Sequence, residues 1–149
     1  MKKILLLLCI TTLVSVKSYS QILKPITWSY AAKKTSATEA IVYIKATLDK
    51  GWHLYSQQVG EGGPAATKFS FPATKNYQRT GKTIEQKPIT KFEPVFLMEV
   101  SYFEDAALFQ QKVKLNSKTA VVKGSVYFMV CNDKQCLPPS TVEFSIPVK

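Results

Sequence analysis

Hydrophobic and polar residues alternate along several segments of this chain. Residues 40–48 carry alanine, valine, isoleucine or leucine at every second position, with tyrosine, lysine and threonine among the residues between them. Successive side chains of a β-strand point to opposite faces, so this pattern predicts a strand with one buried and one solvated face. The segment Asp49-Lys50-Gly51 that follows predicts a turn, because glycine tolerates positive φ angles.

Other segments have the same character and extend the prediction of β-structure. Extended or alternating runs rich in β-branched and aromatic residues occupy 52–56, 67–71, 95–103, 108–115, 118–130 and 141–148. Gly124 interrupts one of these runs and is a candidate β-bulge. No segment of helical length has an apolar period of 3.6 residues. Seven or eight short strands separated by turn signals indicate a single all-β domain, built as a sandwich or a barrel.

The first twenty residues differ from the rest. Lys2 and Lys3 precede an apolar stretch at residues 4–16, and the small residues Ser18 and Ser20 precede Gln21. This order is typical of a secretory signal peptide cleaved near Ser20/Gln21, which leaves residues 21–149 as the mature domain. A membrane anchor is the alternative, but the apolar run is shorter than the ~20 residues that span a bilayer. We therefore expect an exported, periplasmic chain whose mature form does not insert into the membrane.

Composition and charge narrow the function classes. The chain has 149 residues, 46% of them hydrophobic and 11% aromatic, which excludes a disordered protein. Three of the twenty basic residues lie in the signal segment and all ten acidic residues lie outside it, so the formal charge falls from +10 to +7. Export separates the protein from nucleic acid, and the scattered lysines indicate a solvated surface. Nucleic acid is therefore not an expected partner.

The mature chain keeps two cysteines after the signal segment, with Cys9, is removed. Cys131 follows a predicted strand, four polar residues come next, and Cys136 precedes Leu137-Pro138-Pro139. Facing arms of a tight hairpin can supply the Cα separation of ~4.4–6.8 Å that a disulfide needs. A structural disulfide and a pair that cycles between dithiol and disulfide both fit this pattern. Closing so short a loop contributes little stability, whereas an exposed hairpin tip is accessible to another protein's thiolate.

Other chemistries have less support. Two cysteines and the single histidine, His53, form a small ligand set for zinc, so neither a metal nor another cofactor is expected. No paired carboxylates or Ser-His-Asp set indicates a hydrolase. The cysteine spacing is not Cys-x-x-Cys and no βαβ pattern surrounds it, which argues against a thioredoxin-like domain. By itself, His53 is compatible with a packed, hydrogen-bonded role or a catalytic one.

Three segments resemble a known family. Val126–Cys131 together with Cys136–Pro139 resembles the active-site hairpin of the N-terminal periplasmic domain of DsbD, the thiol:disulfide interchange protein. Residues 49–55 are similar to that family's glycine-aromatic segment near the cysteines. Residues 92–100 are similar to its acidic, phenylalanine-containing cap loop, which covers the disulfide. The resemblance extends from about residue 28 to residue 148.

The resemblance implies an immunoglobulin-like β-sandwich with thiol-disulfide oxidoreductase activity of the protein-disulfide reductase type. Such a domain would relay reducing equivalents from a membrane-embedded DsbD-like donor, or a thioredoxin-like protein, to periplasmic disulfide-containing proteins. Cys131 and Cys136 would form the redox pair, the first buried and the second reacting with partners. The remaining implied site residues are His53 and Tyr55 beside the pair, and Phe96, or alternatively Phe92, next to Glu93 in the cap.

The chain also departs from the family. The loop between the cysteines is one residue shorter than in the best-known members, and His53 stands where an aromatic residue is expected. The membrane domain and C-terminal thioredoxin-like domain of a full DsbD are not in this sequence, so the donor would act in trans. A non-enzymatic immunoglobulin-like binding module with a structural disulfide is therefore the alternative hypothesis.

Overall fold

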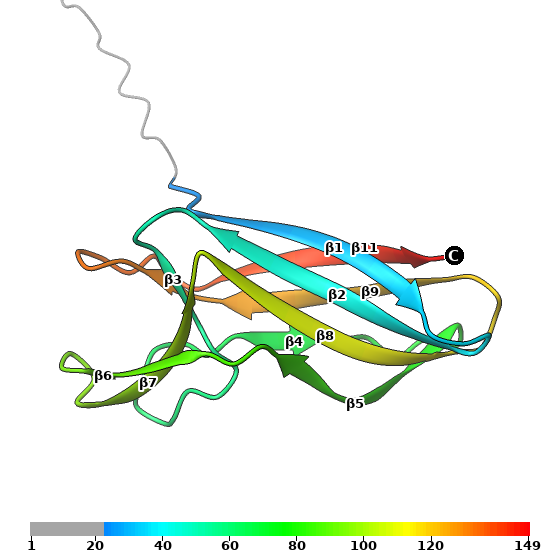
Figure 1. The fold of residues 1–149 in the computed structure, drawn as a ribbon, viewed down its shortest axis with the longest axis horizontal. Helices are drawn as coiled ribbons and strands as arrows, with labels where there is room; N and C mark the ends of the chain where they lie inside the picture. The colour runs from blue at the N-terminus through cyan, green and yellow to red at the C-terminus, as the bar shows by residue number, and fades with distance from the viewer. Residues whose placement is uncertain (1–22) are drawn as a thin grey trace, which may run out of the picture.

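The computed structural model describes residues 23–149, and within this range the chain forms β-strands and no helix (Figure 1). The strands are β1 (Ile26–Lys34), β2 (Glu39–Leu48), β3 (His53–Tyr55), β4 (Lys68–Ser70), β5 (Tyr77–Glu85), β6 (Ile89–Glu93), β7 (Met98–Glu104), β8 (Ala106–Leu115), β9 (Ala120–Phe128), β10 (Val130–Cys131) and β11 (Ser140–Val148). No helix long and apolar enough to cross a membrane occurs among these residues. The predicted signal peptide at residues 1–20 and its cleavage site at Ser20/Gln21 lie outside the described residues.

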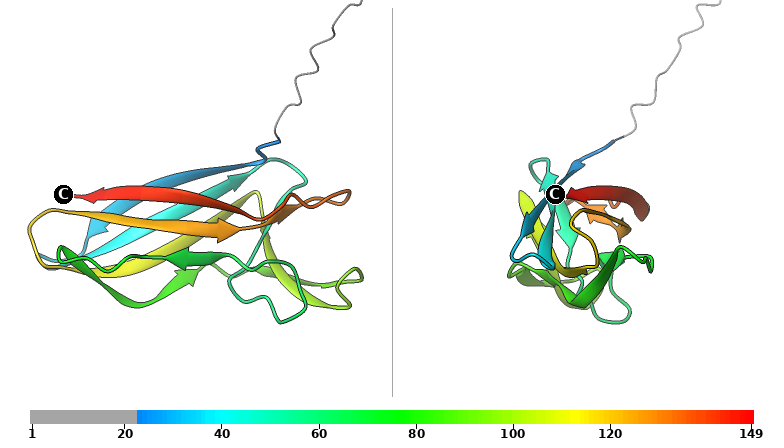
Figure 2. Two further views of the ribbon diagram at one scale, coloured as in Figure 1. Left: turned by 180° about the vertical axis from the view of Figure 1, so that it is seen from behind. Right: turned by 90° about the vertical axis from the view of Figure 1, so that its right-hand side faces the viewer.

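Two antiparallel sheets pack face to face and enclose the main core (Figure 2). One sheet has the strand order β1-β2-β8-β5 and the other β11-β9-β4. The alternating face of β2 supplies the buried side chains of Val42 and Ile44, and β8 supplies Phe109. The opposite sheet contributes Val122 and Ile146 to the same cluster. The prediction of an all-β domain is confirmed, and the architecture is a sandwich.

A third sheet, with the order β10-β3-β7-β6, lies at one end of the sandwich and is built largely from extensions of its strands. β2 continues into β3 through the predicted turn, where Gly51 has φ of 82°. β7 enters β8 through Asp105, whose φ of 57° lies in the left-handed region that aspartate tolerates better than most residues. β9 continues into β10 through Met129. The loop after β10 and the β6–β7 hairpin therefore project from the same end of the molecule (Figures 1 and 2).

Gly124 does not form the predicted bulge. The register between β9 and β11 runs without a shift through the pair Gly124–Phe144. A Cβ atom at residue 124 would lie 2.6 Å from the Phe144 ring and would also collide with the backbone oxygen of Ser70. Glycine is required at this position because β4 and the Phe144 ring approach the backbone closely.

The predicted strand at 95–103 begins later, at Met98, because the preceding residues form a turn. In this turn the Phe96 amide donates a hydrogen bond to the Glu93 carbonyl over 3.1 Å, and Leu97 has φ of 53°. This turn joins β6 to β7, and β6 was not predicted from the sequence.

The edge strand β5 was not predicted either, and it contains an irregularity. Its register against β8 shifts between Thr80 and Ile84. The fully buried side chain of Gln111 fills this break, because its amide donates to the Thr80 carbonyl over 2.9 Å and its oxygen accepts from the Thr83 hydroxyl over 2.8 Å. The buried amide group of Gln111 is thereby satisfied by the interrupted strand.

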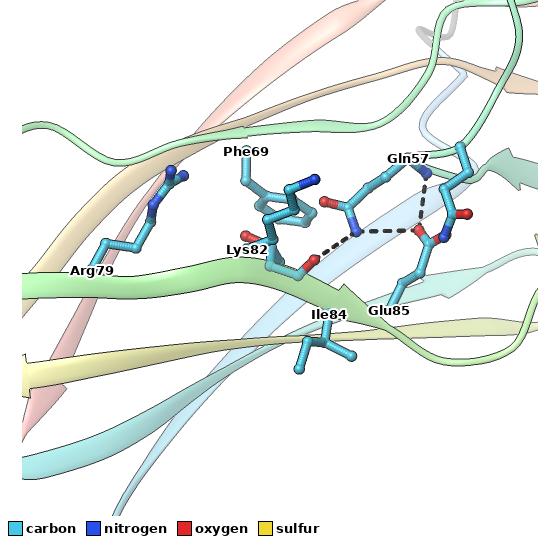
Figure 3. Close-up of a pocket in the computed structure, with 8 residues that line it drawn as sticks. Gln57, Phe69, Arg79, Lys82, Ile84 and Glu85 are labelled. Atoms are coloured by element: carbon cyan, nitrogen blue, oxygen red, sulfur yellow. Dashed lines mark hydrogen bonds between the residues drawn. The ribbon is translucent and has the colours of Figure 1, made fainter.

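A hollow of about 670 Å³ lies beside this irregularity (Figure 3). Glu85 orders one side of it by accepting hydrogen bonds from the backbone and side-chain amides of Gln57, over 2.9 and 3.3 Å. The lining residues are Gln57, Gln58, Phe69, Arg79, Lys82, Thr83, Ile84 and Glu85. None of them belongs to the third sheet or to the cysteine loop, so the hollow is separate from the site described next.

Candidate functional site

Cys131 and Cys136 form a disulfide at the end of the molecule where the third sheet lies. The sulfur atoms are 2.02 Å apart and the Cα atoms 4.0 Å apart, slightly closer than the expected range. The intervening loop is held by Asn132, whose side-chain oxygen accepts hydrogen bonds of 2.9 Å from the amides of Lys134 and Gln135. The Leu137 amide donates to the Val130 carbonyl over 3.0 Å and so keeps the two arms together.

The two cysteines differ in their access to solvent. Cys131 is only 2% exposed and packs in a small cluster with Tyr55, Val100 and Tyr102. Cys136 is exposed, as are the loop residues between it and Asn132. An incoming thiolate from another protein can therefore reach Cys136, while Cys131 is shielded by the third sheet.

His53 and Tyr55, both on β3, lie beside the disulfide. Cys131 on β10 is the direct cross-strand partner of His53, and Tyr55 is the partner of Tyr102 on β7. The His53 Nε2 atom and the Tyr55 hydroxyl are 3.2 Å apart and form a hydrogen bond. The His53 ring also contacts Tyr102, with ring centroids 5.0 Å apart. The third sheet thus places three aromatic side chains around the buried cysteine.

Burial controls the protonation of these aromatic groups. Desolvation lowers the pKa of His53 from its ordinary value near 6.5, and the negative charges of Glu93, Glu104 and Asp133 oppose this effect in part. Burial, reinforced by Glu93, raises the pKa of Tyr55 to about 12. At neutral pH the imidazole is therefore mostly uncharged and the Tyr55 hydroxyl keeps its proton.

The β6–β7 turn holds the two candidates for the cap aromatic in different surroundings. Phe96 is half-buried and packs against the cluster that contains Cys131. Phe92 is 54% exposed and lies outside that cluster, while Glu93 between them is partly buried. Of the two phenylalanines, Phe96 is therefore the one positioned next to the disulfide cluster.

Other cluster members were missed by the sequence analysis. Tyr102 lies within a predicted strand, but its position opposite Tyr55 depends on a pairing that one sequence does not specify. Met98 and Met129 also pack against the cluster, and neither carried a recognisable signal. Among residues 23–149, no three histidine, cysteine or acidic side chains are grouped so that they could hold a metal ion.

Comparison with known proteins is consistent with this geometry. The model of the family described as thiol:disulfide interchange protein DsbD, N-terminal, matches residues 21–147. No curated protein matches the sequence significantly.

Three solved structures share the fold. The N-terminal periplasmic domain of ScsB from Proteus mirabilis is 17% identical with a TM-score of 0.57, and the match covers 85% of this chain and 47% of that one. This chain therefore spans about half the length of the ScsB chain. The reduced DsbD N-terminal domain of Neisseria meningitidis is 14% identical with a TM-score of 0.51, over 78% of this chain and 82% of that one.

The third structure is a complex between the DsbD N-terminal and PilB N-terminal domains from Neisseria meningitidis. It is 14% identical with a TM-score of 0.54, and the match covers 84% of this chain and 87% of that one. These similarities establish the immunoglobulin-like sandwich, and the family match covers nearly the entire domain. The chain therefore belongs to the family of DsbD N-terminal domains, which transfer reducing equivalents by thiol-disulfide exchange.

Proposed function

We propose that this chain is a periplasmic thiol-disulfide oxidoreductase of the protein-disulfide reductase type, with Cys131 and Cys136 as its redox pair. The observation that carries the proposal is the asymmetry of the pair, because Cys131 is buried and Cys136 is exposed. Thiol-disulfide exchange proceeds through a mixed disulfide, which requires one accessible sulfur and one that resolves the intermediate. A disulfide with only a structural role has no need of this asymmetry.

The proposed exchange has two half-reactions, and atoms and electrons balance in each. A donor thiolate attacks the Cys136 sulfur, a mixed disulfide forms, and Cys131 leaves with the electron pair and takes up a proton. A second donor thiol then releases Cys136, so the donor becomes oxidised and the pair becomes a dithiol. In the next half-reaction the Cys136 thiolate attacks a partner's disulfide, and Cys131 resolves that intermediate and restores the disulfide.

The β6–β7 turn is proposed to act as the cap over this site. Phe96 would cover the pair on the side of Cys131, with Glu93 at the base of the turn, while His53 and Tyr55 would line the other side. The packing of Phe96 against the Cys131 cluster supports this assignment. The exposed position of Phe92 gives it no comparable contact.

The partners are proposed to be protein domains. One structural neighbour is a complex of a DsbD N-terminal domain with a PilB N-terminal domain, which supports a protein domain as the partner. The donor would be a membrane-embedded DsbD-like protein or a thioredoxin-like protein acting in trans, and the acceptors would be exported proteins with disulfides. The signal peptide predicted at residues 1–20 would bring the chain to the periplasm.

A redox titration of the protein in glutathione and dithiothreitol buffers tests the proposal. The midpoint is expected within roughly −180 to −270 mV, the range of exchange proteins. A pair that stays oxidised below about −300 mV would favour the binding module with a structural disulfide instead.

A trapping experiment identifies the partner. The variant Cys131→Ala keeps the exposed Cys136 thiol but cannot resolve a mixed disulfide. It is expected to retain a partner protein in a reductant-sensitive adduct in periplasmic extracts, whereas Cys136→Ala retains none. Equal capture by both variants would contradict the assignment of Cys136 as the attacking residue.

A further inference from the structure

Four residues of the third sheet and the cysteine loop lie in one row across neighbouring backbone segments. Cys136 forms an antiparallel bridge with Cys131, Cys131 pairs with His53, and His53 pairs with Glu104. Directly opposite residues of antiparallel strands place their side chains on the same face, with Cβ atoms about 4.5–5.5 Å apart. The backbone register therefore aligns an exposed sulfur, a buried sulfur, an imidazole and a carboxylate in that order.

A buried thiol in this position needs a proton acceptor. An ordinary cysteine has a pKa near 8.5, and burial in apolar surroundings raises it, so Cys131 in the mixed disulfide would be almost entirely protonated at pH 7. The thiolate is the nucleophile that must resolve the intermediate. Burial raises the pKa of the Tyr55 and Tyr102 hydroxyls, so both stay protonated at neutral pH. Neither can therefore accept the proton of Cys131.

We propose that His53 is the general base for Cys131 and that Glu104, the cross-strand partner of His53 on β7, is a positioning residue for the imidazole. This inference rests on the proposed exchange function and deepens it. His53 is the single histidine of the sequence, and it stands directly opposite Cys131 in the register.

The step conserves atoms and electrons. In the mixed disulfide between Cys136 and a partner, the neutral imidazole takes the proton from the Cys131 thiol. The Cys131 sulfur then attacks the Cys136 sulfur, and the bond between Cys136 and the partner's sulfur breaks. The partner's sulfur leaves with the electron pair as a thiolate, and the imidazolium returns its proton to that thiolate or to water.

The surroundings of His53 suit a base that works near neutral pH. Burial keeps the imidazole uncharged, which a proton acceptor requires, while nearby carboxylates prevent its pKa from falling further. The titratable and charged groups that face His53 are Tyr55 on β3, Lys91 and Glu93 on β6, Tyr102 and Glu104 on β7, and Asp133 in the cysteine loop.

The resolution step can be observed directly with 5,5′-dithiobis(2-nitrobenzoate). The protein is first reduced with a phosphine, and one equivalent of the reagent is added in a stopped-flow instrument. Attack by Cys136 releases the first thionitrobenzoate in a bimolecular phase. Attack by Cys131 releases the second in a first-order phase that does not depend on concentration. The rate of this second phase is measured between pH 5 and pH 9.

His53→Phe keeps an aromatic ring, and His53→Gln keeps a group that can hydrogen-bond to Tyr55. Both variants are expected to slow the second phase at pH 7 about tenfold or more, and to shift its rise to the higher pH at which the thiol ionises without a base. The first phase should stay within about twofold, and native circular dichroism of both variants shows that they are folded. A second phase with the wild-type rate and pH profile in either variant would overturn the proposal.

Glu104→Gln supplies a test at an exposed position, where folding is not at risk. Loss of its negative charge should lower the pKa of His53, so the acid limb of the second phase should move to lower pH. An unmoved limb would overturn the role of Glu104. This assay uses chemically reduced protein and does not depend on the redox potential of the pair. It can therefore contradict the role of His53 while the redox titration supports the exchange function, or the reverse.

Discussion

The two cysteines are chemically identical but lie in different surroundings. Cys131, on β10 of the third sheet, is 2% exposed, whereas Cys136 is exposed at the loop. Reagents that modify thiols must reach the sulfur atom, so the two thiols should react at different rates once the disulfide is reduced. The same asymmetry determines which sulfur a partner protein can attack.

Limited alkylation of the reduced protein should therefore modify Cys136 at least tenfold faster than Cys131. The check is treatment with substoichiometric iodoacetamide at pH 7, followed by peptide mass spectrometry. In denaturant the two residues should react at nearly equal rates, which serves as the control. Preferential labelling of Cys131 in the folded protein would contradict the assignment.

Tyr55 should make the stability of the fold decrease as the pH rises in the alkaline range. Its pKa of about 12 in the folded protein lies above the ordinary value of 10, because burial disfavours the tyrosinate. The folded state therefore holds its proton where the unfolded state has lost it, and the contribution to stability is complete below pH 10 and disappears as the pH rises toward 12. Urea unfolding at pH 9 and pH 11.5 should show a smaller loss for Tyr55→Phe than for the wild type. An equal loss in both proteins would mean that Tyr55 titrates normally.

Among the secondary-structure elements, the β6–β7 hairpin offers a matched pair of phenylalanines. Phe96 packs against the cluster around Cys131, and Phe92 is mainly in solvent. Phe96→Ala should speed reduction of the disulfide by dithiothreitol several-fold, because it uncovers the cluster, while Phe92→Ala should change the rate less than twofold. The rates are measured under pseudo-first-order conditions on oxidised protein. The reverse order of the two variants would identify Phe92 as the cap residue.

The strand β9 carries the tightest backbone contact at Gly124. Gly124→Ala places a methyl group 2.6 Å from the Phe144 ring and against the Ser70 backbone, so β4 or β11 must shift. Such overpacking costs about 1–3 kcal/mol, and the free energy of unfolding in urea should fall by that amount. Lys123→Ala, at the exposed neighbouring position, should change stability by no more than about 0.5 kcal/mol. A neutral Gly124→Ala would show that the neighbouring strands adapt freely.

The strands that bury one face were predictable from the sequence, the edge strand β11 among them, whereas the mostly exposed edge strands β5 and β6 were not. Residues 40–48 alternate because β2 lies centrally with one face on the core. β5 and β6 lie at sheet edges with most of their side chains exposed, so no alternation marks them. A β5 register break, filled by Gln111, further obscures the pattern.

Within the site, too, some residues were predictable from the sequence and others were not. Cys131 and Cys136 were identified because residues close in sequence form their loop. The row that joins them to Glu104 depends on pairings between strands far apart in the chain. Those pairings follow from the way β2, β8 and β9 extend beyond the sandwich, and local sequence patterns do not encode them.

For the entire fold, the disulfide lies outside the main core. The cluster between the two sandwich sheets contains neither cysteine, whereas Cys131 belongs to the smaller cluster at the end of the molecule. The fold should therefore persist when the pair is reduced, as a protein that alternates between two redox states requires.

The stability difference between the two redox states can be estimated from the loop that the disulfide closes. The cysteines are five positions apart, and closing so short a loop removes chain entropy worth about 2 kcal/mol. Urea unfolding of oxidised and phosphine-reduced protein should differ by no more than about this amount, with native circular dichroism in both forms. Because folding and disulfide formation are linked, the same difference should appear as a potential about 40 mV lower in the folded than in the unfolded protein. A reduced form that unfolds spontaneously would instead mark the disulfide as a structural requirement, and the pair could not cycle without loss of the fold.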